Sequence, residues 1–325
     1  MKKNIAIVGC GYWGKNLVRN FYDLDVLSAV CDPNIEIVNH FAKQYNVKKY
    51  SFNDVINDTN IKGVVLAVPA KLHASMAIDA LNSGKHVFVE KPLAMNENEA
   101  NLMIKVAKKN NVQLMVGHLL RYHPVFAKLR NLLSCGELGK LNYIFSNRLS
   151  FGKIRSHEDV LWSFAPHDLS MILDLAREDP IYVNSNSTSM IQDGIADMAS
   201  INLQFKSGLK SNILISWLHP YKETKLIVVG SSGSIIFDDN KPWKEKLAFY
   251  PFTFSSSKNF VDLKQHEVEY IDVLKEEPLR VECKHFINVI RNNINPLTDG
   301  YDGLRVIKVL TALTKSQNIN RLVKL

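Results

Sequence analysis

The first sign of chemistry in this sequence is a group of glycines near its start. Gly9, Gly11 and Gly14 form the spacing G-x-G-x-x-G directly after the apolar run 5–8, which we predict to be a buried parallel strand. In such a turn the first glycine permits a tight bend, the second lets the backbone approach a pyrophosphate, and the third lets the following helix pack closely. The unpaired N–H groups at the helix start favour an anion. The turn residues expected to contact a dinucleotide are Gly9, Gly11, Tyr12, Trp13 and Gly14.

An acidic residue follows the second predicted strand, 26–31. A carboxylate at Asp32 can accept hydrogen bonds from the adenosine ribose hydroxyls and would repel a 2′-phosphate. Asp32 also precedes Pro33, so a role confined to the turn is the alternative. The position favours NAD over NADP as the cofactor.

Glu90, Lys91 and Pro92 follow the predicted strand 86–89. The carboxyl ends of parallel strands border the crevice in which open α/β sheets bind their ligands. A lysine there can stabilise negative charge on a substrate oxygen, whereas most lysines are ordinary surface residues. The place at a strand end favours a catalytic role for Lys91.

The second half of the chain supplies basic residues that could bind an anion. Guanidinium groups bind phosphates and carboxylates through paired hydrogen bonds. An ordinary ion pair at the surface would explain these arginines equally well. The residues that would suit a substrate with a diphosphate are Arg121 with its neighbour Tyr122, Arg148, Lys153 and Arg155.

The elements that must position these groups follow from the residue pattern. Over 1–118, apolar runs alternate with amphipathic stretches, which predicts βα units in a doubly wound parallel sheet, a Rossmann domain that binds a dinucleotide. Over 119–325, alternating polarity and turn residues predict a second domain with helices and a mostly antiparallel sheet. Its C-terminal helices can pack back on the first domain. The helices expected in this half are 124–133, 164–176, 278–293 and 300–316.

Composition limits the remaining classes of function. The 325 residues suggest two domains, and no apolar run approaches the ~20 residues of a membrane span, so we expect a cytoplasmic protein. The net charge of +8 comes from scattered lysines, which favours an anionic small molecule over nucleic acid. The four cysteines lack metal-ligand spacing, so we expect buried reduced thiols and no metal.

Together these motifs resemble the Gfo/Idh/MocA family of sugar and inositol oxidoreductases, over nearly the whole chain. The resemblance implies that Lys91 lies at the reacting centre and that Glu90 and Pro69 line the nicotinamide pocket. It places Val68 and His73 at the cofactor. Pro92 matches a proline that, in the family, often follows a cis peptide bond. The resemblance also implies that 119–325 form an α/β domain for substrate binding and oligomerisation, with a large open sheet, one face of which forms a homodimer or homotetramer. The matching stretches are 5–14, 29–33, 68–69 with His73, 84–92, 116–118, 121–124, 167–168 and 298–309.

The second catalytic segment departs from the family. The family usually has an aspartate four positions before the histidine that matches His167, and here that position is Ser163. The proton path must then depend on another group, such as Asp168 or Asp174. Trp162 could cover the nicotinamide or the sugar, or could belong to the core.

The stretches 147–155 and 162–168 resemble family members that serve surface-polysaccharide pathways. The resemblance therefore implies an NAD-dependent 3-dehydrogenase of a UDP-N-acetylhexosamine, or of its uronic acid, in surface-polysaccharide synthesis. It implies that His167 exchanges the hydroxyl proton, which suits a group that titrates near neutrality, although a structural hydrogen bond is the alternative. Lys91 would stabilise charge on the same oxygen. The alternatives are a dehydrogenase of a free sugar or inositol-type polyol, and a sensor or scaffold that binds the cofactor with little catalysis. The residues predicted to contact substrate are Lys91, Arg121, Tyr122, Arg148, Arg155, His167 and Asp168.

Overall fold

The computed structural model describes residues 3–152, 154–156, 158–257 and 260–325. The chain divides into two compact units that interleave along the sequence. The first contains the residues up to Tyr122 together with Glu277–Ile307. The second contains His123–Glu276 and Lys308–Leu325. The first unit therefore takes up a segment from near the chain end.

The first unit is built on a six-stranded sheet in which every neighbouring pair is parallel. Its order is β3-β2-β1-β4-β5-β6, so the direction of winding reverses between β1 and β4. This confirms the predicted doubly wound parallel sheet. The strands are β1 (Ile5–Val8), β2 (Leu27–Cys31), β3 (Lys48–Lys49), β4 (Gly63–Leu66), β5 (His86–Glu90) and β6 (Leu114–Gly117).

Helices cover both faces of this sheet, because its strands are apolar on both sides. One core cluster joins the sheet to α1 (Gly14–Asp23), α2 (Ile35–Tyr45) and α8 (Pro278–Asn292). Another joins it to α3 (Phe52–Asn57), α4 (His73–Asn82) and α5 (Glu97–Lys109). The short 3-10 turns η1 (Ala70–Leu72) and η2 (Leu119–Tyr122) follow β4 and β6.

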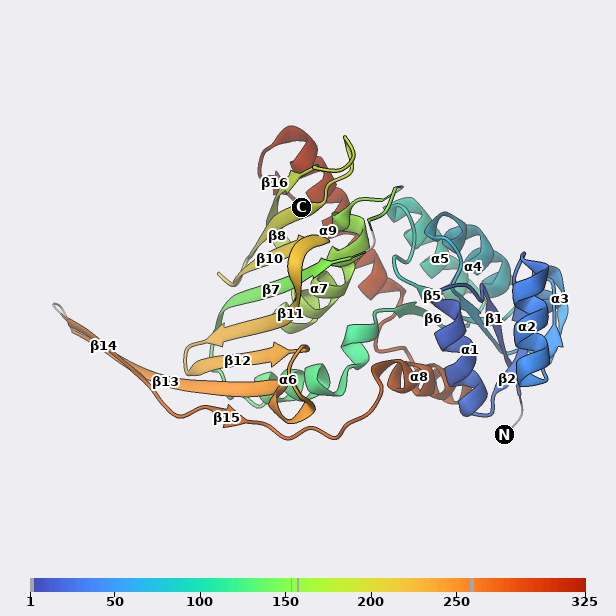
Figure 1. Ribbon diagram of the computed structural model, residues 1–325, viewed down its shortest axis with the longest axis horizontal. Helices are drawn as coiled ribbons and strands as arrows, with labels where there is room; N and C mark the ends of the chain where they lie inside the picture. The colour runs from blue at the N-terminus through green and yellow to red at the C-terminus, as the bar shows by residue number, and fades with distance from the viewer. Residues whose placement is uncertain (1–2, 153, 157, 258–259) are drawn as a thin grey trace. The chain divides into compact units, whose positions relative to one another are not determined.

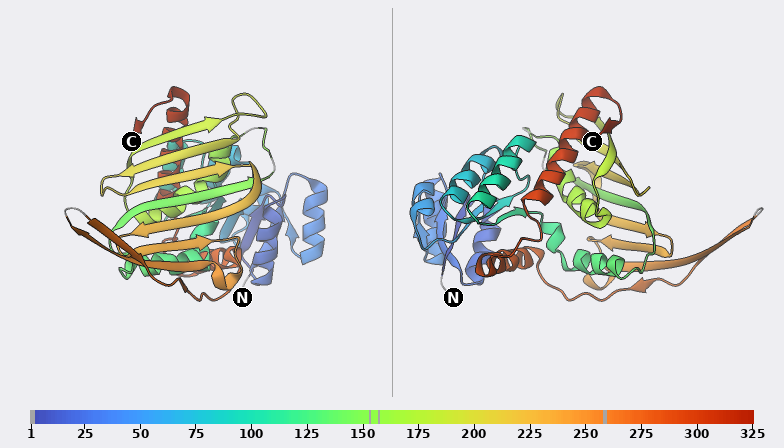
Figure 2. Two further views of the ribbon diagram at one scale, coloured as in Figure 1. Left: turned by 60° about the vertical axis from the view of Figure 1, so that its left-hand side comes forward. Right: turned by 180° about the vertical axis from the view of Figure 1, so that it is seen from behind.

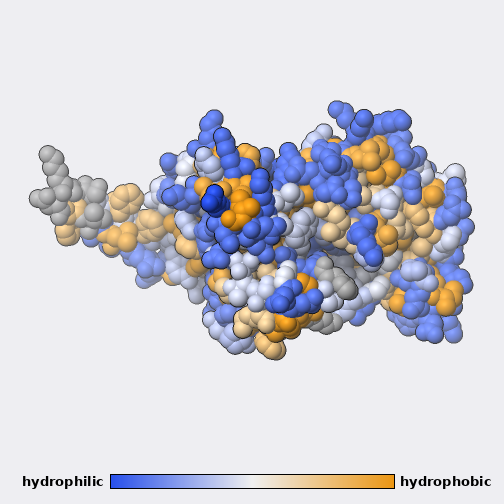
Figure 3. All heavy atoms as spheres, turned by 90° about the horizontal axis from the view of Figure 1, so that it is seen from above, coloured by the Kyte–Doolittle hydropathy of each residue, from blue (hydrophilic) through white to orange (hydrophobic). Residues whose placement is uncertain are grey.

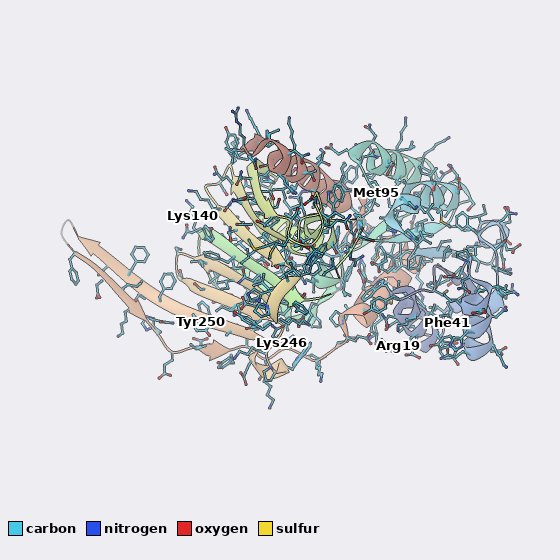
Figure 4. The ribbon with its side chains drawn as sticks, turned by 45° about the horizontal axis from the view of Figure 1, so that its top comes forward. Arg19, Phe41, Met95, Lys140, Lys246 and Tyr250 are labelled. Carbon is cyan, nitrogen blue, oxygen red and sulfur yellow. The ribbon has the colours of Figure 1, made fainter. Side chains whose placement is uncertain are left out.

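Helix α8 packs beside α1 on the sheet (Figure 1). Gly63 makes room for it, because a Cβ there would lie 2.4 Å from Ile290 Cδ1. Arg19, labelled on α1 in Figure 4, holds the start of α8 through an ion pair of 2.5 Å with Glu277. The return of the chain thus completes one side of the sheet that carries the glycine turn.

The second unit is built on a ten-stranded sheet that is antiparallel apart from the parallel pair β7 and β10, which confirms a mostly antiparallel sheet. Its path runs β14-β13-β12-β11-β7-β10-β9-β8-β16, and β15 pairs with β13. The strands are β7 (Leu141–Phe151), β8 (Pro180–Thr188), β9 (Met198–Phe205), β10 (Lys210–Ser216), β11 (Leu218–Gly230), β12 (Gly233–Asp238), β13 (Leu247–Ser257), β14 (Phe260–Gln265), β15 (Glu269–Tyr270) and β16 (Val323–Lys324).

The helices of this unit lie on one face of its sheet, and the left panel of Figure 2 looks onto the other face. They are α6 (Pro124–Ser134), α7 (Val160–Ala176) and the later part of α9 (Gly300–Ile319), with the short turn η3 (Trp243–Glu245) at the sheet edge. Helix α7 begins four residues before the predicted start, because the Asp159 side chain caps it by accepting the Trp162 N–H at 3.0 Å.

Two further expectations meet the structure here. Cys10, Cys31 and Cys283 are buried thiols as predicted, whereas Cys135 is exposed at the end of α6, so the expectation was wrong there. In the described part of the chain, none of the helices has the length and apolar character that a bilayer span requires.

Candidate functional site

The glycine turn between β1 and α1 has the geometry that its three glycines predict. Gly9 has φ +92°, and a Cβ at this position would lie 2.4 Å from the Ala67 carbonyl oxygen. A Cβ at Gly14 would lie 1.9 Å from the Gly9 oxygen. A Cβ at Gly11 would meet nothing within 4 Å. The first and third glycines are therefore required by packing, while the second leaves backbone open to a ligand.

Asp32 lies beside this turn at the end of β2. Its Oδ2 accepts the Cys10 N–H at 2.7 Å, and its Oδ1 accepts the Asn34 N–H at 2.9 Å. A carboxylate has about four acceptor positions, so these two bonds leave capacity for ribose hydroxyls. The structure thus brings together the turn and the acid that sequence reasoning assigned to one dinucleotide.

The turn also reaches the end of β5. The Trp13 indole N–H donates a hydrogen bond of 2.5 Å to Glu90 Oε1. Burial raises the pKa of Glu90 to about 7, against the opposing effects of the Trp13 bond and the Lys91 charge. Tyr12 instead points outward, 74% exposed, with the Lys15 ammonium 5.5 Å from its ring centre.

His73 links the segments that follow β4 and β5. Its ring nitrogens lie 2.7 Å from the Pro92 carbonyl oxygen and 2.9 Å from that of Val68. Burial lowers the pKa of His73, so the ring is neutral near neutral pH. The Lys91-Pro92 peptide bond is cis, and Lys91 is half-buried where β5 ends.

The end of β6 carries a histidine that sequence reasoning gave no role. His118 is 1% exposed, and neither ring nitrogen has a hydrogen-bond partner among the described residues. Burial, together with the charges of Arg121 and Lys91, lowers its pKa to about 3. Arg121 is itself buried, 3.7 Å from an Asp302 carboxylate oxygen, and the Tyr122 hydroxyl lies 2.8 Å from Thr298 Oγ1.

A second residue that sequence reasoning missed is Glu282 on α8. It is fully buried, and its carboxyl oxygens have no hydrogen-bond partner among the described residues. Burial, and then repulsion from Glu90, raise the pKa of Glu282 well above its usual range. The amphipathic pattern of α8 gave no signal of this, because a glutamate in a helix normally faces solvent.

In the second unit, α7 carries Trp162, Ser163 and His167. Ser163 is buried and lies one turn before the half-buried His167, so the two occupy the same side of the helix. The Trp162 indole N–H donates to Thr314 Oγ1 at 3.1 Å. Pro166 falls inside the helix and cannot donate to the carbonyl four residues earlier.

Asp168 anchors α7 to the sheet. Its two oxygens accept hydrogen bonds of 2.6 Å from Arg148 Nε and from Ser146 Oγ, and Asp168 is 1% exposed. Arg155 pairs with Glu158 at 2.7 Å, and its side chain is 53% exposed. The structure therefore pairs Arg148 with Asp168, while Lys153 lies outside the described residues.

Known proteins match both units. The model of an oxidoreductase family with an NAD-binding Rossmann fold matches residues 3–118, and that of the Gfo/Idh/MocA C-terminal domain matches residues 126–236. Oxidoreductase P35 of Formosa agariphila is 33% identical over 281 residues, which cover 79% of this chain and 82% of that protein. The chain belongs to the Gfo/Idh/MocA family of oxidoreductases. It binds NAD and is a dehydrogenase that acts on CH–OH groups.

Two of the relatives are named for dehydrogenase activities on different substrates. The UDP-N-acetylglucosamine 3-dehydrogenase of Acidithiobacillus ferrooxidans is 25% identical over 305 residues, 93% of each chain. A solved structure of that enzyme has a TM-score of 0.86 and 23% identity, covering 97% of each chain. The NAD(+)-dependent scyllo-inositol 2-dehydrogenase of Bacillus subtilis is 26% identical over 330 residues, 96% of this chain and 93% of that one.

Gly14 and Gly11 have different surroundings, so an alanine at each position should affect a different property of the protein. Gly14→Ala should lower the free energy of unfolding by about 2 kcal/mol, because its Cβ overlaps the Gly9 carbonyl. Gly11→Ala should leave stability within about 0.5 kcal/mol and weaken NAD binding about tenfold or more, because its Cβ points into open space that the pyrophosphate needs. Urea unfolding and NAD titration measure the two effects. Wild-type NAD affinity in Gly11→Ala would contradict this account.

Glu282 predicts a pH dependence of stability. Because its folded pKa is raised, the native protein keeps a proton that the unfolded chain releases above about pH 4.5, so stability falls as the pH rises. Glu282→Gln should remove this component, and its free energy of unfolding should fall less between pH 5 and pH 8 than that of the wild type. Urea unfolding at both pH values measures the difference.

Glu277 provides a control on the same helix. Although burial opposes it, hydrogen bonds from Arg19 and Asn20 lower the pKa of Glu277, so its contribution is present at neutral pH and lost in acid. Glu277→Gln should therefore reduce stability at pH 8, and its effect should diminish progressively as the pH falls below about 4.5. The same pH trend in both variants would count against the assigned state of Glu282.

Proposed function

We propose that this protein is an NAD-dependent 3-dehydrogenase of a UDP-N-acetylhexosamine, or of its uronic acid, that serves surface-polysaccharide synthesis in the cytoplasm. The observation that carries the proposal is the similarity to a UDP-N-acetylglucosamine 3-dehydrogenase over 93% of both chains. The Glu90-Lys91-Pro92 sequence at the end of β5 and His167 on α7 add the groups that carbinol chemistry needs.

The first unit has a site that fits NAD. Gly11 leaves the turn open, the start of α1 offers N–H groups to the pyrophosphate, and Asp32 has acceptor capacity for the adenosine ribose. Val68 and Pro69 at the end of β4, with Glu90 and Trp13, flank the nicotinamide half. When bound, NAD supplies the hydride acceptor or donor, and the protein orients it.

Two side chains act on the substrate oxygen in this proposal. The Lys91 ammonium donates a hydrogen bond to the C3 oxygen and stabilises the charge that develops there. His167 takes the hydroxyl proton during oxidation and returns it during reduction. Trp162, which we assign to the cofactor, has its indole N–H held by Thr314 of the same unit.

A specific observation also favours a polyol substrate. Each of the three arginines assigned to a diphosphate is paired with a carboxylate: Arg121 with Asp302, Arg148 with Asp168, and Arg155 with Glu158. An uncharged polyol would need none of them, and the scyllo-inositol relative spans nearly the whole chain. A free inositol is therefore the second candidate substrate.

The outer face of the ten-stranded sheet supports a further part of the proposal, a homodimer or homotetramer. Paired strands place an apolar row across this face, with Phe145 beside Ile227 and Ile227 beside Ile236. Phe145 is 43% exposed. Past the residues that pair with β12, the segment 252–257 of β13 pairs with β14 in a two-stranded ribbon that exposes Phe254 and Leu263; Figure 3 shows hydrophobic side chains along it. Two-stranded ribbons are marginal in water, so a second copy is the covering partner that we propose.

A substrate panel tests the activity. Absorbance of reduced nicotinamide should report turnover of UDP-N-acetylhexosamines and their uronic acids with kcat/KM about 100-fold above that for scyllo- or myo-inositol. Lys91→Ala and His167→Ala should each lower kcat/KM by about 100-fold or more. The matched controls Lys105→Ala and His40→Ala change exposed helix residues and should stay within about twofold. Faster turnover of an inositol would select the second candidate, and unchanged kcat/KM in both variants would remove the assigned roles.

The assembly is tested by light scattering on the purified protein. We expect two or four copies in the wild type, and a lower mass for Phe145→Glu, because a buried unpaired charge disfavours the interface. Leu102→Glu, an equally exposed apolar residue on α5, serves as the control and should keep the wild-type mass. A monomeric wild type would contradict the proposed interface.

A further inference from the structure

Glu90 is the point at which three parts of the first unit meet. Its Oε1 accepts the Trp13 indole N–H from the glycine turn at 2.5 Å. Its Oε2 accepts the backbone N–H of Lys91 at 3.3 Å. On the β6 side, a Cβ at Gly117 would lie 3.0 Å from Oε2, so only a glycine leaves room for the carboxyl group. The carboxyl is thus held between the turn and two strand ends.

The topology directs one end of the cofactor to this carboxyl. Asp32 on β2 marks the adenosine side, and the glycine turn after β1 holds the pyrophosphate. Because the strand order continues from β1 to β4 and β5, the other half of the dinucleotide extends toward the strand ends that carry Val68 and Glu90. The oxidised nicotinamide ring is a cation, and the reduced ring is neutral. A charge at Glu90 therefore acts differently on the two forms.

We propose that Glu90 is a switchable charge that selects between the redox states of the cofactor. In its ionised form, held by the Trp13 indole, it favours the cationic oxidised ring. In its protonated form it shows no such preference. This inference rests on NAD binding and not on the identity of the substrate.

Glu90 changes its charge near neutral pH, whereas the groups that face it keep theirs. Burial raises the pKa of Glu90 to about 7. From α8, burial and the negative charge of Glu90 raise the pKa values of Glu282 and Cys283 well above their usual range, so both stay protonated while Glu90 titrates. At the end of β6, His118 stays neutral, because burial lowers its pKa to about 3. Lys91 adds a positive charge.

The sign of the pH effect follows. Oxidised cofactor binds better to ionised Glu90, so its binding to the protonated form releases one proton and its affinity rises with pH. The reduced cofactor gains nothing from the charge. The ratio of the dissociation constants, reduced over oxidised, should therefore rise about tenfold between pH 5.5 and pH 8.5, the change that one pKa unit of linkage produces.

The test is a calorimetric titration of the whole protein with NAD+ and, separately, with NADH, without substrate. At pH 6.5, titrations in two buffers of different ionisation enthalpy should show proton release with NAD+ and none with NADH. Glu90→Gln keeps the shape of the side chain and should make the affinity ratio independent of pH. A constant ratio in the wild type, or a Glu90→Gln variant that still follows the wild-type curve, would overturn the proposal.

Trp13 gives a second, graded test. Trp13→Phe keeps an aromatic ring but removes the donor to the carboxylate, so the midpoint of the affinity ratio should move up by about one pH unit. Trp243→Phe is the matched control: it removes an indole whose N–H bonds to the Val273 carbonyl, and it should keep the wild-type midpoint. An unmoved midpoint in Trp13→Phe would overturn the role given to the indole.

Discussion

The close approach of Gly14 to the Gly9 carbonyl oxygen sets the position of the first turn of α1. A side chain at Gly14 would begin 1.9 Å from that oxygen, so the helix can lie this close to β1 only with a hydrogen at the position. The contact brings the unpaired N–H groups of α1 to the edge of the sheet at which the winding reverses. It also places Trp13, at the start of α1, within hydrogen-bonding distance of Glu90 on β5. The proposed pyrophosphate site and the contact between the glycine turn and β5 therefore depend on one backbone contact.

The same edge of the sheet contains polar groups that the fold does not need. Glu282 and His118 are buried without hydrogen-bond partners among the described residues, and each such group costs about 1–3 kcal/mol. Both lie within electrostatic range of the residues that end β5, Glu282 of Glu90 and His118 of Lys91. A core selected for stability alone would have apolar residues at these positions. Their concentration where β5 and β6 end is the pattern expected of a site whose ionisation states matter to function.

The sequence predicted the elements whose signals are local. Continuous apolar runs identified the parallel strands, because a strand covered on both faces has no polar side. The glycines and Asp32 identified the turn, since their roles depend on neighbours in the same βα unit. The predicted helix 164–176 began too late, because the Asp159 cap and the buried residues after it begin α7 at Val160. Strand β13 was missed because Pro251 and a run of serines interrupt its alternation.

The parts of the site that escaped prediction depend on tertiary burial. Neither His118 nor Glu282 belongs to a motif with a known spacing, and only the packing of α8 and η2 shows that both are enclosed.

Burial also determines how readily each arginine could give up its carboxylate partner for a substrate phosphate. A substrate phosphate at Arg148 would have to displace a fully buried Asp168, which leaves an unpaired charge that costs about 3–5 kcal/mol. At Arg155 the pair with Glu158 lies at the surface, where such pairs contribute about 0.2–1 kcal/mol. Arg155 can therefore exchange its partner for a phosphate at little cost, while Arg148 serves to hold α7 and, with it, His167.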